Sequence, residues 1–246
     1  MPYLLSLDND EDKANYIDNL VNMTYIKDVV ERNHLRGDTI LDALFNILSS
    51  SIGSLTNPTK LANTFKSHQI ETSDITISRD IDYLIDAFII RKATRYDIKG
   101  KRYIDSPYKY YFSDIGLRNS RLNFRQQEQT LILDNIIYNE LVVRGFNVDV
   151  GTIEHAEKDT DGKQKNVRHE VDFISNKGSA RYYIQSAYTL SKEDKQESEI
   201  KHLDLIPDSF KKIIATQDYA KPWRTDKGHL VIHLFDFLLN ENSMDL

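Results

Sequence analysis

Carboxylates in the second half of the chain have the spacing of a divalent-metal site. Glu170 and Asp172 are two residues apart in a strand-like stretch, so both side chains are expected on one face. Glu140 lies in an apolar helical stretch upstream, at the edge of the helix face that would meet a sheet. Gln185 and Ala187 share a face of the next strand. Carboxylates converging from a helix and a strand, with a further acid and a lysine from the next strand, would hold Mg²⁺ and activate water for phosphodiester attack.

The order of these positions resembles the restriction-endonuclease-like family named for its PD-(D/E)xK motif. The resemblance implies that Glu140 is the helix acid and that Asp172 is the strand aspartate. It also implies that Gln185 stands at the position of the second acid and Ala187 at that of the lysine. The second half of the chain, residues 128–246, is therefore expected to be a nuclease-like domain with a mixed α/β sheet.

Two of these four positions depart from the active pattern. Gln185 offers one uncharged oxygen, whereas a hard divalent ion prefers charged oxygen ligands. Ala187 has no donor to stabilise the charge that develops on the phosphoryl group. We therefore expect a degenerate site without nuclease turnover. A hydrogen-bonded remnant and weak Mg²⁺ binding by Glu140, Glu170 and Asp172 both stay open, and no other cofactor is expected.

Strings along nearly the whole chain resemble the C-terminal part of a prokaryotic AAA-type ATPase family whose tail is a domain of unknown function. They cover residues 25–30, 51–55, 109–118, 138–141, 170–174, 183–185 and 235–239, and the string at 109–118 is the most specific. The resemblance implies that glutamine at the nuclease-acid position is usual in this family and that an ATPase module lies upstream. No G-x-x-x-x-G-K-[ST] loop occurs in the sequence, so we expect no ATP binding through a P-loop in this chain.

The elements of the first half have the order of a winged helix. Residues 1–37 are acidic and helical in pattern, and we expect them to be the tail of the absent ATPase module. Residues 38–117 are expected to form a winged helix-turn-helix domain of three short helices and a β-hairpin. The expected helix starts are Asp38 or Thr39, Asn57 before Pro58, and Ser73 or Asp74. A polar connector is expected over 118–127, followed by a long helix that ends at Gly145 and by the strands of the sheet domain.

The expected hairpin is basic, and the helix before it is acidic. The hairpin positions that could contact nucleic acid are Arg91, Lys92, Arg95, Lys99, Lys101 and Arg102. They favour a wing that follows phosphates, although a merely solvated hairpin explains the pattern equally well. The third helix has one cation, Arg79, against four aspartates, which would repel a major groove. This helix is therefore at least as well suited to docking a protein.

Composition limits the classes of function. Apolar residues make up 40% and charged residues 28%, as in globular proteins, and the net charge of −6 means that any nucleic-acid binding must be local. There is no cysteine, no apolar run of membrane-spanning length and no secretory signal pattern, so we expect a cytoplasmic protein without membrane contact.

The function expected from these patterns is that of a non-catalytic recognition or regulatory module of an AAA-type ATPase, acting on DNA, RNA or a protein partner. An active Mg²⁺-dependent nuclease is one alternative. A protein-interaction module without DNA binding is the other.

Overall fold

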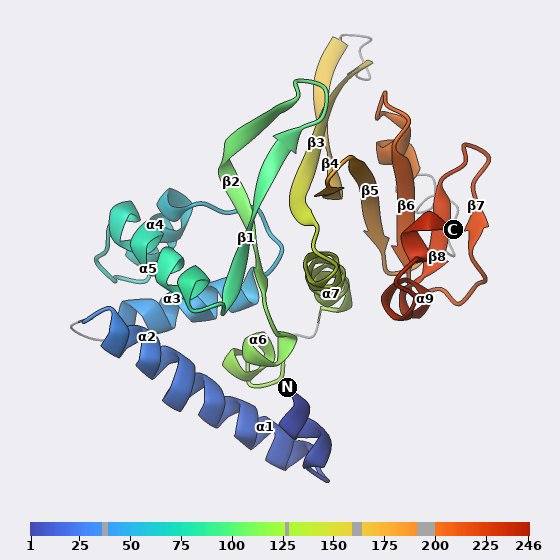
Figure 1. The fold of residues 1–246 in the computed structure, drawn as a ribbon. Coiled ribbons are helices and arrows are strands. Elements are labelled where there is room, and N and C mark those ends of the chain that lie inside the picture. Colours follow the sequence, from blue (N-terminus) through green and yellow to red (C-terminus); the bar gives the residue numbers. More distant parts are fainter. Residues whose placement is uncertain (36–38, 126–127, 159–163, 191–199) are drawn as a thin grey trace. The chain divides into compact units, whose positions relative to one another are not determined.

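The computed structural model describes residues 1–35, 39–125, 128–158, 164–190 and 200–246. It has a mixed α/β fold with an eight-stranded mixed sheet, whose strand order is β2-β1-β3-β4-β5-β6-β8-β7 (Figure 1). The prediction of a mixed α/β fold is confirmed. The chain divides into two compact units: residues 1–92 with 107–128, and residues 93–106 with 129–246.

The first unit begins with an amphipathic helical segment. After a 3₁₀ turn (Pro2–Ser6), the helix α1 (Asp10–Asn19) continues through a π-helical stretch (Leu20–Ile26) into α2 (Lys27–Arg32). The side chain of Asn9 caps α1 by accepting a hydrogen bond from the Asp12 N–H at 2.8 Å. Ile17, Val21 and Val29 are buried, as expected for the apolar stripe of a helix that packs along one side.

Three shorter helices follow: α3 (Thr39–Ser50), α4 (Pro58–Ser67) and α5 (Asp74–Asp86). Two of the expected caps are confirmed, because Asn57 accepts from the Lys60 N–H at 2.7 Å and Ser73 accepts from the Thr76 N–H at 3.1 Å. The alternative cap Asp38 lies outside the described residues. An isolated antiparallel bridge joins Thr56, between α3 and α4, to Tyr108.

The expected hairpin consists of β1 (Ile90–Asp97) and β2 (Arg102–Phe112), and each strand has residues in both units. The hairpin is therefore divided between the units, whereas the expected winged-helix domain, residues 38–117, contained all of it. The physical reason is strand pairing, since Arg95 to Asp97 pair in parallel with Val150 to Thr152 of β3. The far half of the hairpin thus belongs to the sheet of the second unit.

The expected polar connector is partly wrong, because a helix, α6 (Ile115–Arg121), occupies its start. Asp114 caps this helix by accepting from the Gly116 N–H at 2.7 Å. Arg118 is 1% exposed, and its Nε donates to the main-chain oxygen of Ser49 at 3.0 Å. A buried arginine interrupts the apolar periodicity on which the sequence-based expectation rested.

The second unit is built around the rest of the sheet. Its elements are α7 (Gln129–Val143), β3 (Asn147–Lys158), β4 (Gln164–Lys177), β5 (Ala180–Ala187), β6 (Lys211–Thr216), β7 (Trp223–Arg224), β8 (Leu230–His233), α9 (Leu234–Leu239) and a 3₁₀ turn (Ser243–Asp245). The helix α7 packs against β3, β4 and β5, and α9 packs against β6 and β8. Strands β5, β6 and β8 run parallel, whereas β4 is antiparallel to its two neighbours.

A shift of register interrupts the alternation of β4. Asp149 pairs with Ile174 and Gly151 pairs with Val171, so both Asp172 and Phe173 lie opposite the single residue Val150. This is the arrangement of a β-bulge. Val171 and Ile174 therefore pack in the same core cluster although they are three residues apart.

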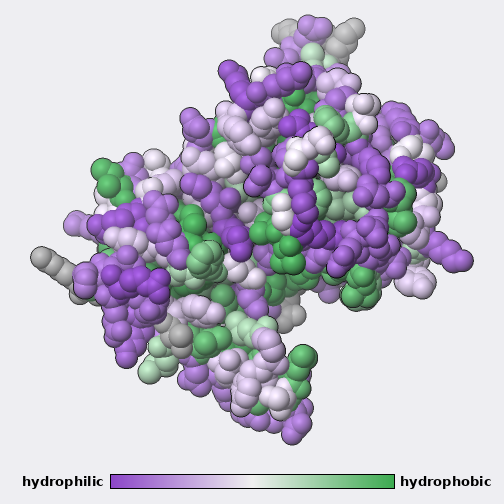
Figure 2. All heavy atoms as spheres, viewed as in Figure 1, coloured by the Kyte–Doolittle hydropathy of each residue, from purple (hydrophilic) through white to green (hydrophobic). Residues whose placement is uncertain are grey.

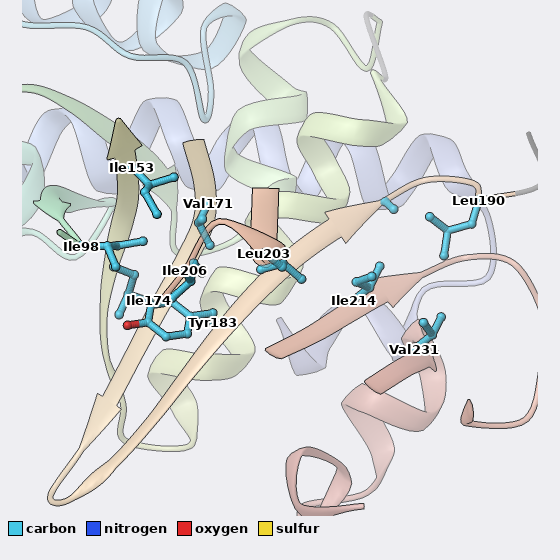
Figure 3. Packing of buried hydrophobic residues seen from close by; sticks show 11 residues of the cluster. Ile98, Ile153, Val171, Ile174, Tyr183, Leu190, Leu203, Ile206, Ile214 and Val231 are labelled. Carbon is cyan, nitrogen blue, oxygen red and sulfur yellow. The ribbon is translucent and has the colours of Figure 1, made fainter. Parts of the chain in front are cut away.

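One core cluster of the second unit joins strands of the sheet to the segment that contains Leu203 and Ile206. Ile153, Val171, Ile174, Tyr183 and Ile214 pack there with Leu203 and Ile206 (Figure 3). Each fully buried aliphatic side chain of this kind stabilises the fold by about 1.5–3 kcal/mol. Residues 200–204 are helical, whereas most of the helix expected from Glu193 lies outside the described residues.

Hydrophilic side chains cover most of the molecular face in Figure 2, and apolar residues are interspersed among them. None of the helices in the described ranges is long and apolar enough to cross a membrane.

Candidate functional site

Asp172 and Gln185 lie side by side on β4 and β5, where the two main chains stop pairing. The last residues in register are Phe173 and Ile184. Beyond them, the N–H of Asp172 donates to Gln185 Oε1 at 3.4 Å, and the N–H of Ser186 donates to Asp172 Oδ2 at 2.8 Å. Side-chain oxygens thus take the place of main-chain carbonyls between the two strands.

A second carboxylate, Asp134 from α7, reaches the same place. The hydroxyl of Ser186 donates to Asp134 Oδ1, and both residues are 6% exposed. Ser186 therefore bonds one carboxylate through its N–H and another through its O–H. Sequence reasoning assigned no role to Asp134. The available signal was a polar pair, Asp134 and Asn135, inside an otherwise apolar helical run.

Glu140 does not belong to this site, contrary to the sequence-based expectation. It accepts from Arg144 Nε at 2.7 Å, and the Arg144 guanidinium in turn lies over the Phe237 ring, 4.9 Å from its centroid. Six residues along an α-helix correspond to about 9 Å of rise and about 240° of rotation. Because Asp134 faces Ser186, the Glu140 side chain points away from this site. Its ion pair with Arg144 lies at the C-terminal end of α7.

Glu170 lies two residues before Asp172 on β4. It pairs with Thr152 across β3, and it interacts electrostatically with Arg95. Among the residues that the structure describes, no group of three or more His, Cys, Asp or Glu side chains could hold a metal ion. The structure therefore does not bring Glu140, Glu170 and Asp172 together as a set of three carboxylate ligands.

Ala187, at the position that the resemblance implies for the catalytic lysine, is enclosed by apolar side chains. It is 4% exposed and belongs to the same core cluster as Leu190 and Leu203. An ammonium group would lose its hydration there without gaining an anionic partner from those side chains. Because Asp172 Oδ2 accepts a hydrogen bond from the main chain of β5, the Asp172 side chain is suited to holding β4 and β5 together.

The turn between β1 and β2 carries the exposed cations of the expected wing. Gly100 donates to Asp97 Oδ1 at 2.9 Å, and a Cβ on Gly100 would lie 2.2 Å from Asp97 Oδ2, so only glycine fits without a shift. Ile98 is buried and donates to the Thr152 main-chain oxygen at 2.9 Å. Lys99 Nζ donates to the main-chain oxygen of Glu154 at 2.7 Å. These bonds fix the turn against β3.

Three of the six expected nucleic-acid contacts, Lys99, Lys101 and Arg102, lie exposed on this turn, and we call them the basic turn. Arg95 does not belong with them, because it is 4% exposed. Burial, and then the neighbouring Arg168 charge, lowers the pKa of Arg95.

The other two expected contacts lie in the first unit. Arg91 is half-buried, and the exposed ammonium of Lys92 lies 5.0 Å from the centroid of the Tyr108 ring. Beside the basic turn, Tyr103 is 59% exposed, and its ring lies 5.2 Å from that of Tyr96.

The helix α5 presents acidic and apolar groups to solvent. Asp74, Asp82 and Asp86 are exposed. Asp80, by contrast, is 3% exposed and so is not part of the polar face, and burial raises its pKa against the opposing effect of Arg79. This surface is negatively charged, as expected from the sequence.

The fold and these sites define a mixed α/β chain of two units, with a carboxylate bridge inside the sheet and a basic turn at its edge. The chain belongs to the family described as "Domain of unknown function (DUF8612)", whose model matches residues 1–128.

Two curated relatives extend the similarity beyond the family match. An uncharacterized protein of Haemophilus influenzae is 31% identical over 92% of this chain and 52% of its own length. An uncharacterized protein of Methanocaldococcus jannaschii is 28% identical over 94% of this chain and 51% of its own length. The chain thus spans about half the length of these relatives.

A crystal structure of a Vibrio cholerae protein is similar over 93% of this chain and 55% of that one, with a TM-score of 0.28 and 11% identity. A likeness this slight carries no argument. Neither the family description nor the relatives' names specify an ATPase or a nuclease.

Proposed function

We propose that this chain is a non-catalytic recognition module that binds nucleic acid through the basic turn, as part of an AAA-type ATPase. The observation that carries the binding proposal is the exposure of Lys99, Lys101 and Arg102 on a turn held rigid by main-chain and side-chain hydrogen bonds. A rigid cationic turn binds phosphates with little loss of conformational entropy.

Neighbouring groups favour a nucleic-acid ligand over a simple anion. Tyr103 offers an exposed aromatic face on which a base could stack, and such stacking contributes about 1–3 kcal/mol per base. Asp97 offsets part of the charge, since Arg102 Nε lies 3.8 Å from its carboxylate. The net charge of −6 on the whole chain confines attraction to this turn.

The non-catalytic part of the proposal rests on the carboxylate bridge. Asp172 and Gln185 satisfy main-chain donors, and Ala187 lies in the apolar core. The helix α7 followed by β3, β4 and β5 is consistent with a degenerate nuclease-like domain. The order α3, α4, α5, β1, β2 and the bridge from Thr56 to Tyr108 support a winged helix. The ATPase part rests on the sequence resemblance alone.

A binding measurement tests the proposal directly. Labelled duplex DNA, single-stranded DNA and RNA are titrated at low salt with the wild-type chain and with the triple variant Lys99→Glu, Lys101→Glu, Arg102→Glu. A matched variant, Lys13→Glu, Lys27→Glu, Lys66→Glu, changes the net charge equally in the first unit. We expect binding to be lost in the first variant and kept in the second.

The salt dependence of the affinity reports the number of phosphate contacts. For three phosphate contacts, the affinity for duplex DNA should fall by about 40-fold between about 50 and 200 mM salt. An equal loss of affinity in both triple variants would contradict binding through the basic turn. The absence of binding to any of the three nucleic acids at low salt would contradict it as well.

A second candidate function is protein docking through α5. Ile75 is 79% exposed and Phe88 is 71% exposed, beside the exposed carboxylates of Asp82 and Asp86. Phe88 adopts a positive φ of 56°, a conformation that is costly for a bulky residue. This surface would suit a protein partner with basic and apolar side chains.

A further inference from the structure

A cavity in the second unit has a strongly basic lining. Its volume is about 300 Å³, at the lower end of small-ligand sites. It lies at the start of β6 and of β8, beside β7, and so next to the amino ends of two parallel strands. The charged or aromatic residues in its lining are Phe210, Lys211, Lys212, Arg224, Lys227 and His229.

Two of the cavity's lysines are balanced by carboxylates. Lys211 Nζ lies 2.8 Å from Asp245 Oδ1, and Lys227 Nζ lies 2.6 Å from Asp204 Oδ2. Asp204 also lies 2.8 Å from His229 Nε2. Burial raises the pKa of the Asp204 carboxyl, but the bonds from Lys227 and His229 outweigh this effect and lower it. These pairs contribute little net charge.

Lys212 and Arg224 differ, because both bond to main-chain oxygens. Lys212 Nζ donates to Asp208 O at 2.9 Å and to Ile206 O at 3.3 Å. Arg224 Nη1 donates to Gly228 O at 2.8 Å, and Nη2 donates to Leu246 O. The nearby Asp208 carboxylate accepts instead from the Tyr183 hydroxyl at 2.6 Å. Within the described ranges, the bonds of these two cations go to main-chain oxygens and not to Asp or Glu side chains.

We propose that this cavity binds the phosphate group of a small phosphate monoester. The lining therefore contains more basic side chains than there are acidic side chains paired with them, and an anion is the complementary ligand. The planar Arg224 guanidinium is suited to the bidentate geometry of phosphate. Phe210, 42% exposed at the lining, offers an apolar surface to the organic part of the ester.

The site is independent of the basic turn, because its residues lie on β6, β7, β8 and the adjoining loops. Substitution of Lys99, Lys101 and Arg102 should therefore leave phosphate binding unchanged. Failure of nucleic-acid binding and failure of phosphate binding are separate results.

Calorimetric titration of the whole chain with inorganic phosphate and with a nucleoside 5′-monophosphate, in a phosphate-free buffer, tests the proposal. The parent nucleoside serves as the ligand control. We expect saturable binding of both phosphates and none of the nucleoside. Arg224→Gln and Lys212→Gln should each weaken binding by at least about tenfold, as expected for loss of a charged hydrogen bond. The exposed-surface controls Arg125→Gln and Lys165→Gln should bind as the wild type does.

Arg224 also bonds Gly228 and Leu246, so its variant could unfold locally. Ser209→Trp keeps every cation but fills the cavity with a side chain from its wall, and it should abolish binding with the far-ultraviolet circular dichroism spectrum unchanged. The proposal is overturned if neither phosphate binds saturably to the wild type. It is equally overturned if folded Arg224→Gln and Ser209→Trp variants both retain wild-type affinity.

Discussion

Asp172 and Gln185 exchange hydrogen bonds with each other's strands at the point where β4 and β5 separate. Gln185 Oε1 accepts from the Asp172 N–H, and Asp172 Oδ2 accepts from the N–H that follows Gln185. The two side chains therefore extend the sheet by one step beyond its last main-chain pair. The Asp172 carboxylate therefore has a structural role in the sheet.

Removal of either side chain should destabilise the second unit. Asp172→Ala leaves the buried N–H of Ser186 without its acceptor, and we expect the free energy of unfolding to fall by about 1–3 kcal/mol. Asp172→Asn retains an acceptor oxygen and should cost less. Urea denaturation measures both. Equal stability of the wild type and Asp172→Ala would contradict a structural role for this carboxylate.

Restoring the residues of an active nuclease should not restore cleavage. The variant Gln185→Glu, Ala187→Lys introduces a carboxylate beside Asp172 and an ammonium into the apolar cluster around Leu190 and Leu203. We expect a loss of thermal stability and no Mg²⁺-dependent cleavage of plasmid DNA, because a buried charge without a partner is unfavourable. Divalent-dependent cleavage by this variant would show that the lysine position reaches the carboxylates after all.

The free energy of unfolding of the second unit should depend on pH through the buried carboxyl of Asp149. Burial raises the pKa of Asp149, although the Tyr103 hydroxyl, 3.2 Å away, and Arg181 oppose this shift. The folded state thus binds the proton more tightly than the unfolded state. The protonated carboxyl favours folding below the unfolded pKa of about 3.9, and this contribution is lost as the pH rises through the folded pKa.

Asp149→Asn should therefore gain stability relative to the wild type as the pH rises from about 4 to 7. Tyr103→Phe removes a bond that lowers the pKa, so its loss of stability should be larger at pH 7 than at pH 4. Urea titrations across this range measure both effects, with exposed Asp105→Asn as the control. A stability difference between the wild type and Asp149→Asn that does not change with pH would contradict a raised pKa for Asp149.

Phe88 offers a test of the docking surface on α5. The residue follows the C-cap of the helix, where Phe88 N donates to Ile85 O and Ile89 N donates to Leu84 O, the pattern that favours glycine. Phe88→Gly should relieve a left-handed backbone and stabilise the first unit by about 1 kcal/mol in thermal or urea unfolding. If α5 docks a protein, the same variant should bind that partner more weakly. A less stable Phe88→Gly would mean that the aromatic ring contributes to the fold.

Much of the fold could be predicted from local patterns. The caps at Asn57 and Ser73 and the strands β5, β6 and β8 follow from short-range chemistry, which the sequence displays directly. The pairing of β1 with β3 could not be predicted in this way, because it joins residues more than fifty positions apart. That pairing divides the hairpin between the two units and buries Arg95.

The candidate site was predictable only in part. The adjacency of Asp172 and Gln185 follows from neighbouring strands. The bulge opposite Val150 depends on the partner strand, and it breaks the alternation of β4 between Val171 and Ile174. The helix acid was placed at Glu140, but the rotation of α7 brings Asp134 to Ser186. The apolar surroundings of Ala187 arise from residues distant in the sequence.

Cleavage of supercoiled plasmid DNA in the presence of Mg²⁺ or Mn²⁺, compared between the wild type and Asp172→Ala, tests the non-catalytic account most directly. The account predicts that neither protein cleaves above the level seen with a chelator. Divalent-dependent cleavage by the wild type that is lost in a folded Asp172→Ala variant would contradict it.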